Sequence, residues 1–408
     1  MATYRVQEIE DGFYILRVND RYTNYFEALW EIPEGITYNA YLLKTSEGAV
    51  LFDGWKKVYS SQLIDALETV IGPEELRYVV VNHLEPDHSG SLEDVLRWAP
   101  NAKVLGSRLA ARLIKAFPRA RERFQAVGDG EALELGGERI RFIYTPWLHW
   151  PETMVSWVET RRILVTCDAF GGYGIPFGLF DDECIRWEDA LRAMQKYVVT
   201  VIGHYRGWIV KALDKLHKAG IKPRIIAPAH GLMWRKDPGY VMRFYERLAR
   251  GTPVKGKALV VYGSMYGTVE NMVRRLVCAM AREGYSPVVY GFTDSKRPQL
   301  SEILTDAIDS EVILIAAPTY EADLFPLIRL VAEEICWKAS DGKKAVIVSS
   351  YGWGSMAARR LREILEGCNF SVVESIEYNS VGPAGLHLAE VEELAKKVVE
   401  ALKKGGEA

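Results

Sequence analysis

Cysteine is scarce in this chain of 408 residues, and its five copies are widely scattered. None belongs to a Cys-x-x-Cys pair, which is the spacing typical of a structural zinc site, a tetrathiolate iron or a redox dithiol. We therefore expect reduced thiols, most of them in the core, with Cys167 beside a candidate metal ligand. The five residues are Cys167, Cys184, Cys278, Cys336 and Cys368.

Long apolar runs and an excess of one charge are also missing. No stretch approaches the roughly 18 apolar residues of a membrane span, and the start, Met1 to Val6, lacks the basic-then-apolar pattern of a secretory signal. The 51 basic and 54 acidic residues give a net charge of −3, which argues against bulk electrostatic binding of nucleic acid or an anionic membrane. We expect a cytoplasmic protein.

The length exceeds what one hydrophobic core usually organises, so two domains are expected. A polar stretch with two glycines and a proline, Arg250 to Lys257, has the composition of a linker. The predicted division is residues 1–250, a linker at 251–256, and residues 257–408. In the first domain, apolar strand-like runs outnumber helical segments, which look like covers on sheets. These runs lie at 41–44, 50–52, 78–81, 140–144, 154–158, 163–166 and 225–227.

The second domain has a regular rhythm of apolar strands, each followed by a loop and usually by a helical segment. Such alternation predicts a doubly wound parallel sheet. The five expected strands lie at 259–262, 288–290, 312–316, 345–349 and 372–376. A longer helical region is expected in the first domain at 187–218.

Potential metal ligands crowd the end of one strand in the first domain. The run His83-Leu84-Glu85-Pro86-Asp87-His88 follows an apolar strand immediately, and a strand end is a rigid place from which side chains can converge. Three further candidates, His149, Asp168 and His230, also follow predicted strands. The alternative is a surface turn with solvated side chains. Against it, only seven histidines exist in the whole chain.

Four histidines and three carboxylates are too many ligands for one ion, but they suit two ions that share a carboxylate. Nitrogen ligands with hard carboxylate oxygens and no thiolate favour iron or manganese over structural zinc. The set is His83, Glu85, Asp87, His88, His149, Asp168 and His230.

Three strand ends of the second domain carry residues suited to a flavin mononucleotide. After the first strand, small and hydroxyl residues before a helix can enclose a phosphate with backbone N–H groups. Two other strand ends add aromatic side chains that offer flat faces. The alternative is an ordinary turn with surface or interface aromatics. The loop matches neither the dinucleotide fingerprint nor a Walker loop, so NAD and ATP are not expected. The residues are Ser264, Met265, Tyr266, Gly267, Thr268, Val269, Pro318, Thr319, Tyr320, Glu321, Ser350, Tyr351, Gly352, Trp353 and Gly354.

The histidine and carboxylate pattern resembles that of the metallo-β-lactamase fold, whose motif is His-x-His-x-Asp-His. This sequence has Glu85 where the hydrolases have a histidine, a change that hardens the site and favours redox-active iron. With His149 in a Leu-His-Trp-Pro loop, Asp168 and His230, the chain is similar over essentially its whole length to the flavodiiron proteins, or A-type flavoproteins.

The resemblance implies an α/β protein, with an N-terminal metallo-β-lactamase-like αββα sandwich and a C-terminal flavodoxin-like doubly wound parallel sheet of five strands. It implies that His83, Glu85 and His149 hold one iron, that Asp87, His88 and His230 hold the other, and that Asp168 bridges them. FMN and two iron ions are the implied cofactors.

The implied activity is that of an oxidoreductase that passes electrons from an external donor through FMN to the di-iron centre, reducing dioxygen to water, nitric oxide to nitrous oxide, or both. With no Cys-x-x-Cys, an attached rubredoxin is not expected; a separate rubredoxin or a reduced deazaflavin is the implied donor. The family assembles as a head-to-tail homodimer, with a tetramer also open. Tyr25 and His204 are candidates near the substrate pocket, although a capping or helix-surface role suits His204 equally.

Two other functions remain as alternatives. A metallo-β-lactamase-like hydrolase joined to a flavodoxin would use a metal-bound hydroxide, and zinc in the site would favour it. An electron carrier with a degenerate first domain would hold flavin but no metal. Glu85 argues against the hydrolase, and seven intact candidate ligands argue against the carrier.

Overall fold

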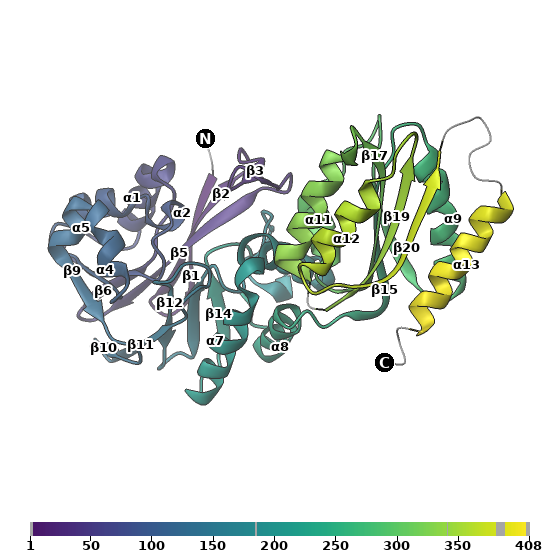
Figure 1. Ribbon diagram of the computed structural model, residues 1–408. Helices are drawn as coiled ribbons and strands as arrows, with labels where there is room; N and C mark the ends of the chain where they lie inside the picture. Colours follow the sequence, from purple (N-terminus) through teal and green to yellow (C-terminus); the bar gives the residue numbers. More distant parts are fainter. Residues whose placement is uncertain (1–2, 184–185, 341, 381–387, 405–408) are drawn as a thin grey trace. The chain divides into compact units, whose positions relative to one another are not determined.

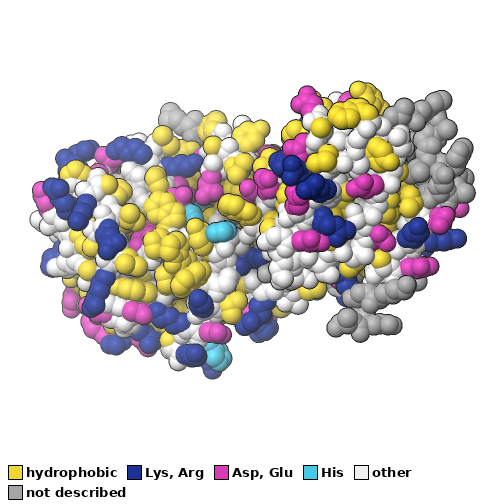
Figure 2. Space-filling model, viewed as in Figure 1, with side chains coloured by type: hydrophobic (Ala, Val, Ile, Leu, Met, Phe, Trp, Pro, Cys, Tyr) yellow, Lys and Arg dark blue, Asp and Glu magenta, His cyan; other side chains and the backbone are white. Residues whose placement is uncertain are grey.

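The computed structural model describes residues 3–183, 186–340, 342–380 and 388–404 (Figure 1). Contacts between Cα atoms divide the chain into two compact units, Met1–Ala249 and Arg250–Ala408. On the face shown in Figure 2, basic and acidic side chains are interspersed over both units. Among the described residues, no helix has both the length and the apolar composition needed to cross a membrane.

Two β-sheets form the middle of unit 1. The first has the order β1-β2-β5-β6-β7-β8-β9, antiparallel from β1 to β6 and parallel from β6 to β9. Its strands are β1 (Thr3–Glu10), β2 (Phe13–Asp20), β5 (Ile36–Thr45), β6 (Gly48–Phe52), β7 (Leu76–Val81), β8 (Lys103–Ser107) and β9 (Phe124–Val127). The second has the order β10 (Ala132–Leu135), β11 (Glu138–Tyr144), β12 (Met154–Val158), β13 (Ile163–Cys167) and β14 (Ile225–Pro228). A short hairpin of β3 (Tyr25–Phe26) and β4 (Trp30–Glu31) stands apart.

The core of unit 1 lies between these sheets. Phe13 and Ile15 of β2 belong to the same buried cluster as Phe142 of β11 and Ile163 of β13. The outer face of the second sheet, including Trp157, packs against the end of α7 (Arg206–Lys218). Helices α1 (Ser60–Glu68), α3 (Leu92–Trp98), α4 (Ala110–Leu113) and α5 (Pro118–Arg123) lie beside the first sheet, and α8 (Pro238–Ala249) contacts α7. This layer order is the predicted αββα sandwich.

The helical region expected at 187–218 is interrupted. It consists of α6 (Trp187–Tyr197), one π-helical turn, η4 (Val198–Ile202), one 3₁₀ turn, η5 (Gly203–Tyr205), and α7. All five residues of η4 are β-branched, and such side chains crowd the preceding turn of an α-helix. The irregular turn follows Tyr197 directly, and the side chain of this tyrosine is part of the site described below.

Unit 2 contains a parallel sheet with the order β16-β15-β17-β19-β20, in which the first strand in sequence occupies the second place. Its strands are β15 (Val254–Gly263), β16 (Ser286–Phe292), β17 (Ser310–Tyr320), β19 (Lys344–Tyr351) and β20 (Ser371–Asn379). A two-residue strand, β18 (Asp323–Leu324), pairs antiparallel with the end of β17. The helices are α9 (Thr268–Arg282), α10 (Leu300–Ala307), α11 (Pro326–Ala339), α12 (Ala357–Glu366) and α13 (Leu388–Lys404).

Strand β15 begins earlier than expected. The sequence places a linker at 251–256, but the strand starts at Val254, whose N–H donates to Asp309 O at 2.8 Å. The amide of Gly256 is likewise satisfied by Glu311, 2.6 Å away. Tertiary hydrogen bonds therefore order a segment whose composition alone is typical of a loop.

The expectation that the cysteines are reduced was wrong for one pair, since Cys336 and Cys368 form a disulfide. Cys278 is exposed on α9. Because 32 residues separate the two bonded cysteines, only the packing of α11 against α12 brings them together. Cys167 is a buried free thiol, as expected, and Cys184 lies outside the described residues.

Candidate metal centre and phosphate-binding edge

Strand ends position the seven candidate ligands of unit 1. His83 follows β7 by two residues, Asp168 follows β13 directly, and His230 follows β14 by two. His149 lies in the loop between β11 and β12. Glu85 precedes the short helix α2 (Pro86–Ser89), which carries Asp87 and His88. All except Glu85 are buried, and the Glu85 side chain is 17% exposed.

One group of ligand atoms comprises those of His83, Glu85, His149 and Asp168, which all lie within 4.8 Å of one another. Glu85 Oε2 is 2.8 Å from His149 Nε2 and 3.3 Å from His83 Nε2. Asp168 Oδ2 is 3.5 Å from His83 Nε2. Atoms that bind a common ion at about 2.1 Å and roughly at right angles lie about 3 Å apart, so these separations suit one ion.

A second group comprises Asp87, His88 and His230. His230 Nε2 is 3.5 Å from Asp87 Oδ2, and His88 Nε2 is 3.4 Å from Asp87 Oδ1. The other oxygen of Asp168, Oδ1, lies 3.0 Å from His88 Nε2 and 3.3 Å from His230 Nε2. Asp168 therefore faces one group with Oδ2 and the other with Oδ1, which is the arrangement that a bridging carboxylate requires.

Several polar atoms of this cluster are buried without a hydrogen-bond partner. They include both carboxylate oxygens of Asp87, Oδ2 of Asp168 and Nε2 of His230. Burying polar atoms without partners costs free energy, and buried carboxylates in particular need a counter-charge. A pair of cations between the two groups would satisfy these atoms. The donor set, nitrogen and hard oxygen without thiolate, fits iron.

Residues outside the predicted set orient the candidate ligands. His83 Nδ1–H donates to Glu152 Oε1 at 2.8 Å, and His230 Nδ1–H donates to the carbonyl oxygen of Thr37 at 2.8 Å. Each contact fixes the tautomer in which Nε2 carries the lone pair for an ion. The hydroxyl of Tyr197 donates to Asp168 Oδ1 at 2.7 Å. Glu152 lies three residues after His149, but no local pattern marked Thr37 or Tyr197.

The electrostatics of the ion-free cluster follow from its charges. Burial lowers the pKa of His88, but Asp87 and Asp168 raise it to about 9. Burial raises the pKa of Glu85, but His149 and His83 lower it to about 2. Burial also raises the pKa of Asp168, while His88 and His230 bring it well below its ordinary value. The Glu85 and Asp168 carboxylates are therefore charged, and a cation would replace the proton held by His88.

The two residues predicted to lie near the substrate pocket are at the surface. Tyr25 is 58% exposed on β3, and His204 is exposed in η5 with its ring against Tyr205. Phe26, the neighbour of Tyr25, is buried, and its ring centroid is 5.9 Å from that of His230. The position that contacts the cluster is thus one residue further along the chain than the one the sequence suggested.

The carboxyl edge of the sheet in unit 2 has the features of a phosphate site. The loop between β15 and α9 ends at Gly267, whose φ of 81° is unstrained only for glycine. None of the backbone N–H groups of residues 265–269 donates a hydrogen bond to another residue that the structure describes. A phosphate at the start of this 15-residue helix would accept from them.

Aromatic rings in three of the loops at this edge are exposed to solvent. Tyr266 is 89% exposed, Trp353 is 85% exposed, and Tyr320 is 37% exposed. Because β15, β17 and β19 are parallel neighbours, their ends place these rings along one edge of the sheet. Such exposure of large apolar groups is unusual, and a flat ligand such as a flavin would cover them. The loop and the rings together fit FMN.

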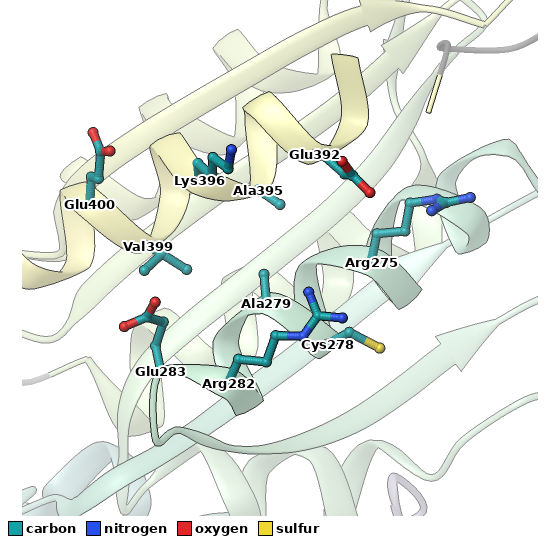
Figure 3. A pocket seen from close by; sticks show the side chains of 10 residues that line it. All are labelled: Arg275, Cys278, Ala279, Arg282, Glu283, Glu392, Ala395, Lys396, Val399 and Glu400. Atoms are coloured by element: carbon teal, nitrogen blue, oxygen red, sulfur yellow. The ribbon is translucent and has the colours of Figure 1, made fainter. Parts of the chain in front are cut away.

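A separate cleft of about 520 Å³ lies between α9 and α13 of the same unit (Figure 3). Its lining mixes charges of both signs, including Arg275, Arg282 and Glu392, with the thiol of Cys278. None of the fifteen residues predicted to contact a flavin lines this cleft.

Comparisons with known proteins agree with this description. The model of the ODP family of β-lactamase-like domains matches residues 36–231. The nitric oxide reductase of Moorella thermoacetica is 30% identical over 370 residues, which are 90% of each chain. The rubredoxin-oxygen oxidoreductase of Megalodesulfovibrio gigas is 28% identical, over 97% of this chain and 98% of that protein. A solved structure of a mutant flavo di-iron protein from Thermotoga maritima is 39% identical, with a TM-score of 0.91, and the match covers 98% of this chain and all (100%) of the other.

A metallo-β-lactamase-like unit with a histidine and carboxylate cluster, joined to a flavodoxin-like unit, defines a class of two-domain redox flavoproteins. Within that class, this chain belongs to the flavodiiron protein family. The predicted family and fold class are confirmed.

Proposed function

We propose that this protein is a flavodiiron oxidoreductase, which takes electrons from an external donor at FMN and reduces dioxygen to water, nitric oxide to nitrous oxide, or both at a di-iron centre. The main support for this proposal is the position of Asp168, whose two carboxylate oxygens face two separate groups of candidate ligands. The names of the relatives, nitric oxide reductase and rubredoxin-oxygen oxidoreductase, support the choice of substrates.

The proposed ligand assignment follows the two groups. His83, Glu85 and His149 would hold one iron, Asp87, His88 and His230 would hold the other, and Asp168 would bridge. When bound, the iron pair and the FMN supply one-electron chemistry and a place for a small gas to bind. The distances within each group and the unpartnered buried atoms support this assignment.

The protein's own residues hold this site in one arrangement. Glu152 and the carbonyl of Thr37 hold His83 and His230 in the tautomer that presents Nε2. Burial and the nearby charge of Asp168 raise the pKa of Tyr197 well above its ordinary value, so its hydroxyl stays protonated and donates a hydrogen bond to Asp168 Oδ1. Buried aromatic rings, including Phe26 and Tyr38, pack around His230 and exclude water from that side.

The deciding experiment begins with metal and flavin analysis of the purified protein. We expect about two irons and one FMN per chain, followed by rapid reoxidation of the anaerobically reduced protein by dioxygen or nitric oxide. The faster gas identifies the preferred substrate. Zinc in the site together with hydrolytic activity and slow flavin reoxidation would instead support the metallo-hydrolase function.

We further propose that a separate rubredoxin or another external carrier supplies the electrons, and that two chains pair head to tail, so that the FMN of one lies beside the irons of the other. The name of the Megalodesulfovibrio relative supports the donor. An exposed apolar side chain in unit 1 supports a protein contact: Phe177, in the loop that begins at Asp168, is fully exposed (102%).

Mixing two inactive variants tests the pairing. Asp168→Asn should lose the irons but keep FMN, and Thr268→Glu should lose FMN by placing a carboxylate in the phosphate loop. If cofactors pair between chains, random exchange of subunits restores about one quarter of wild-type activity, since half the dimers are mixed and each has one intact pair. If they pair within a chain, no activity returns.

A further inference from the structure

Arg17 is a buried cation in the middle of unit 1. It lies on β2 with its side chain 2% exposed, and its guanidinium forms three hydrogen bonds. Nε donates to Asn39 Oδ1 at 3.0 Å, one terminal nitrogen donates to the carbonyl of Gly178 at 3.0 Å, and the other donates to the carbonyl of Gly231 at 2.6 Å. In the described part of the chain, no carboxylate forms an ion pair with it.

The two carbonyls belong to segments that extend from candidate ligands. Gly231 follows His230 directly, and Gly178 lies in the loop that begins at Asp168. Gly178 is 161 residues and Gly231 is 214 residues from Arg17 in sequence, so the guanidinium joins three distant parts of the chain. A planar fork with fixed donors sets the relative positions of its acceptors more tightly than a flexible amine would.

Asn39 extends this connection on β5. Its backbone N–H donates to the carbonyl of Ala229 at 2.7 Å, and its side-chain amide donates to the carbonyls of Pro228 and Gly231. Arg17 in turn orients the Asn39 side chain through Oδ1. The backbone on both sides of His230 is therefore held by donors from β2 and β5.

Such a buried charge is costly to keep. Burial lowers the pKa of Arg17 to about 10, although the nearby charge of Glu183 opposes this shift. Arg17 therefore remains charged at neutral pH without an ion-paired carboxylate. Replacing a buried charge by an apolar side chain of similar volume is often neutral or stabilising, provided that the remaining polar groups find partners. Global stability alone is therefore a weak reason for an arginine at this position.

We propose that Arg17 is a positioning residue, which fixes His230 relative to Asp168 and so sets the affinity of the group formed by Asp87, His88 and His230 for its metal ion. This inference rests on the proposed di-iron function. Removing a contact that orients a metal ligand on the side away from the ion typically lowers metal affinity by about 10- to 100-fold.

The test compares three variants of the holoprotein. Arg17→Met removes the fork and the charge while keeping a similar stem, and Arg17→Lys keeps the charge but cannot serve all three acceptors. The matched control is Arg162→Met, because Arg162 donates two hydrogen bonds to the carbonyl of Lys222 at the opposite end of β13 from Asp168. Each protein is equilibrated with a rising concentration of an iron chelator, and iron and FMN per chain are counted.

For Arg17→Met we expect one of the two irons to be lost at about 10- to 100-fold lower chelator concentration, with the other iron and the FMN retained as in the wild type. For Arg17→Lys, the chelator concentration that removes this iron should lie between those for the wild type and for Arg17→Met. For Arg162→Met, it should match that of the wild type. Loss of both irons in parallel with a lower melting temperature would indicate a merely structural role and overturn the inference. So would wild-type iron retention in Arg17→Met.

If Arg17→Met does not fold, Arg17→Lys decides: a selective shift of one iron supports the inference, and no shift overturns it. A wild-type protein that binds fewer than two irons would overturn the proposed function itself. Two irons in the wild type with unchanged retention in the Arg17 variants would overturn only the positioning role.

Discussion

The single hydroxyl of Tyr197 is the clearest case in which one atom outside the candidate ligand set shapes the centre. Asp168 offers Oδ2 to one group and Oδ1 to the other, and the tyrosine donates to Oδ1 at 2.7 Å. A hydrogen bond to a charged group typically contributes about 1.5–3 kcal/mol. This contact would therefore change how strongly the Asp168 carboxylate donates electron density to the irons.

Tyr197→Phe should therefore keep both irons and lower kcat/KM for the gas by about 10- to 100-fold. Iron analysis and gas electrodes measure the two quantities separately. Tyr173→Phe is the matched control, because that buried tyrosine shares a hydrogen bond of 2.9 Å with Thr200 and makes none to the cluster residues. Equal losses of kcat/KM in the two variants, or loss of iron from Tyr197→Phe, would show that the hydroxyl acts through packing.

Among short elements, the turn after β2 shows how one carboxylate holds the chain that leads from β2 to Phe26 beside the metal centre. Asp20 Oδ1 accepts from the backbone N–H groups of Tyr22 and Thr23, and Oδ2 accepts from the Thr23 hydroxyl. This turn leads into β3, whose Phe26 packs against His230. Burial raises the pKa of Asp20, but these hydrogen bonds and Lys56 lower it below its ordinary value.

A depressed folded-state pKa gives stability that is present above the unfolded pKa, about 3.9, and is lost as the pH falls through the folded value. Asp20→Asn should thus lower the free energy of unfolding by about 1–2 kcal/mol at pH 7. The difference from the wild type should shrink as the pH falls below about 4. Urea unfolding at several pH values checks this, and a pH-independent difference would exclude the charge as the cause.

The turn between β17 and β18 is strained. Glu321 and Ala322 have φ values of 49° and 60°, a left-handed pair that the two-residue hairpin from Tyr320 to Asp323 requires. Asn and Gly are the residues suited to such positions. The strain falls in a loop that is predicted to contact the flavin, where backbone strain often serves function.

Glu321→Asn combined with Ala322→Gly should stabilise unit 2 by about 1 kcal/mol, or roughly 2–4 °C in melting temperature. Thermal unfolding of the flavin-free protein measures this gain. Asn369→Gly, at another left-handed position (φ 65°) in the same unit, is a control for the general effect of glycine. A higher melting temperature together with weaker FMN binding would assign the strain to cofactor contact, whereas no stabilisation would contradict the proposed strain.

Over the whole molecule, the two proposed cofactor sites fall in two separate compact units. A ligand that binds only the folded form stabilises it by mass action, so each cofactor should stabilise the unit that holds it. Removal of iron with a chelator should lower the melting transition of unit 1 and leave that of unit 2 unchanged. Removal of FMN should do the reverse. Calorimetry of the four forms tests this, and one transition that shifts with either cofactor would contradict independent units.

Local patterns in the sequence predicted the doubly wound sheet of the second domain and brought seven residues into one hypothesis, because several of these residues follow apolar runs directly. The αββα sandwich of the first domain followed from the family resemblance. His83, Asp168 and His230 all follow strands whose apolar runs are plain in the sequence. The sequence did not predict strands β1, β2, β8, β9 and β10. For β1 the reason is its exposure, which leaves it without a clear apolar period. The break in the helical region has a local signal, the run of β-branched residues at 198–202, which the prediction of one helical region did not take into account. The disulfide has no local signal.

The sequence by itself determined which residue types were available for metal and phosphate, and that two domains would carry them. The tertiary structure alone decided which atoms face each other: the two oxygens of Asp168, the hydroxyl of Tyr197, the carbonyl of Thr37 and the fork of Arg17. Tyr197 lies 29 residues from Asp168, and Arg17 lies 214 residues from Gly231. Contacts over such separations depend on how sheets stack, and no short-range pattern encodes that packing.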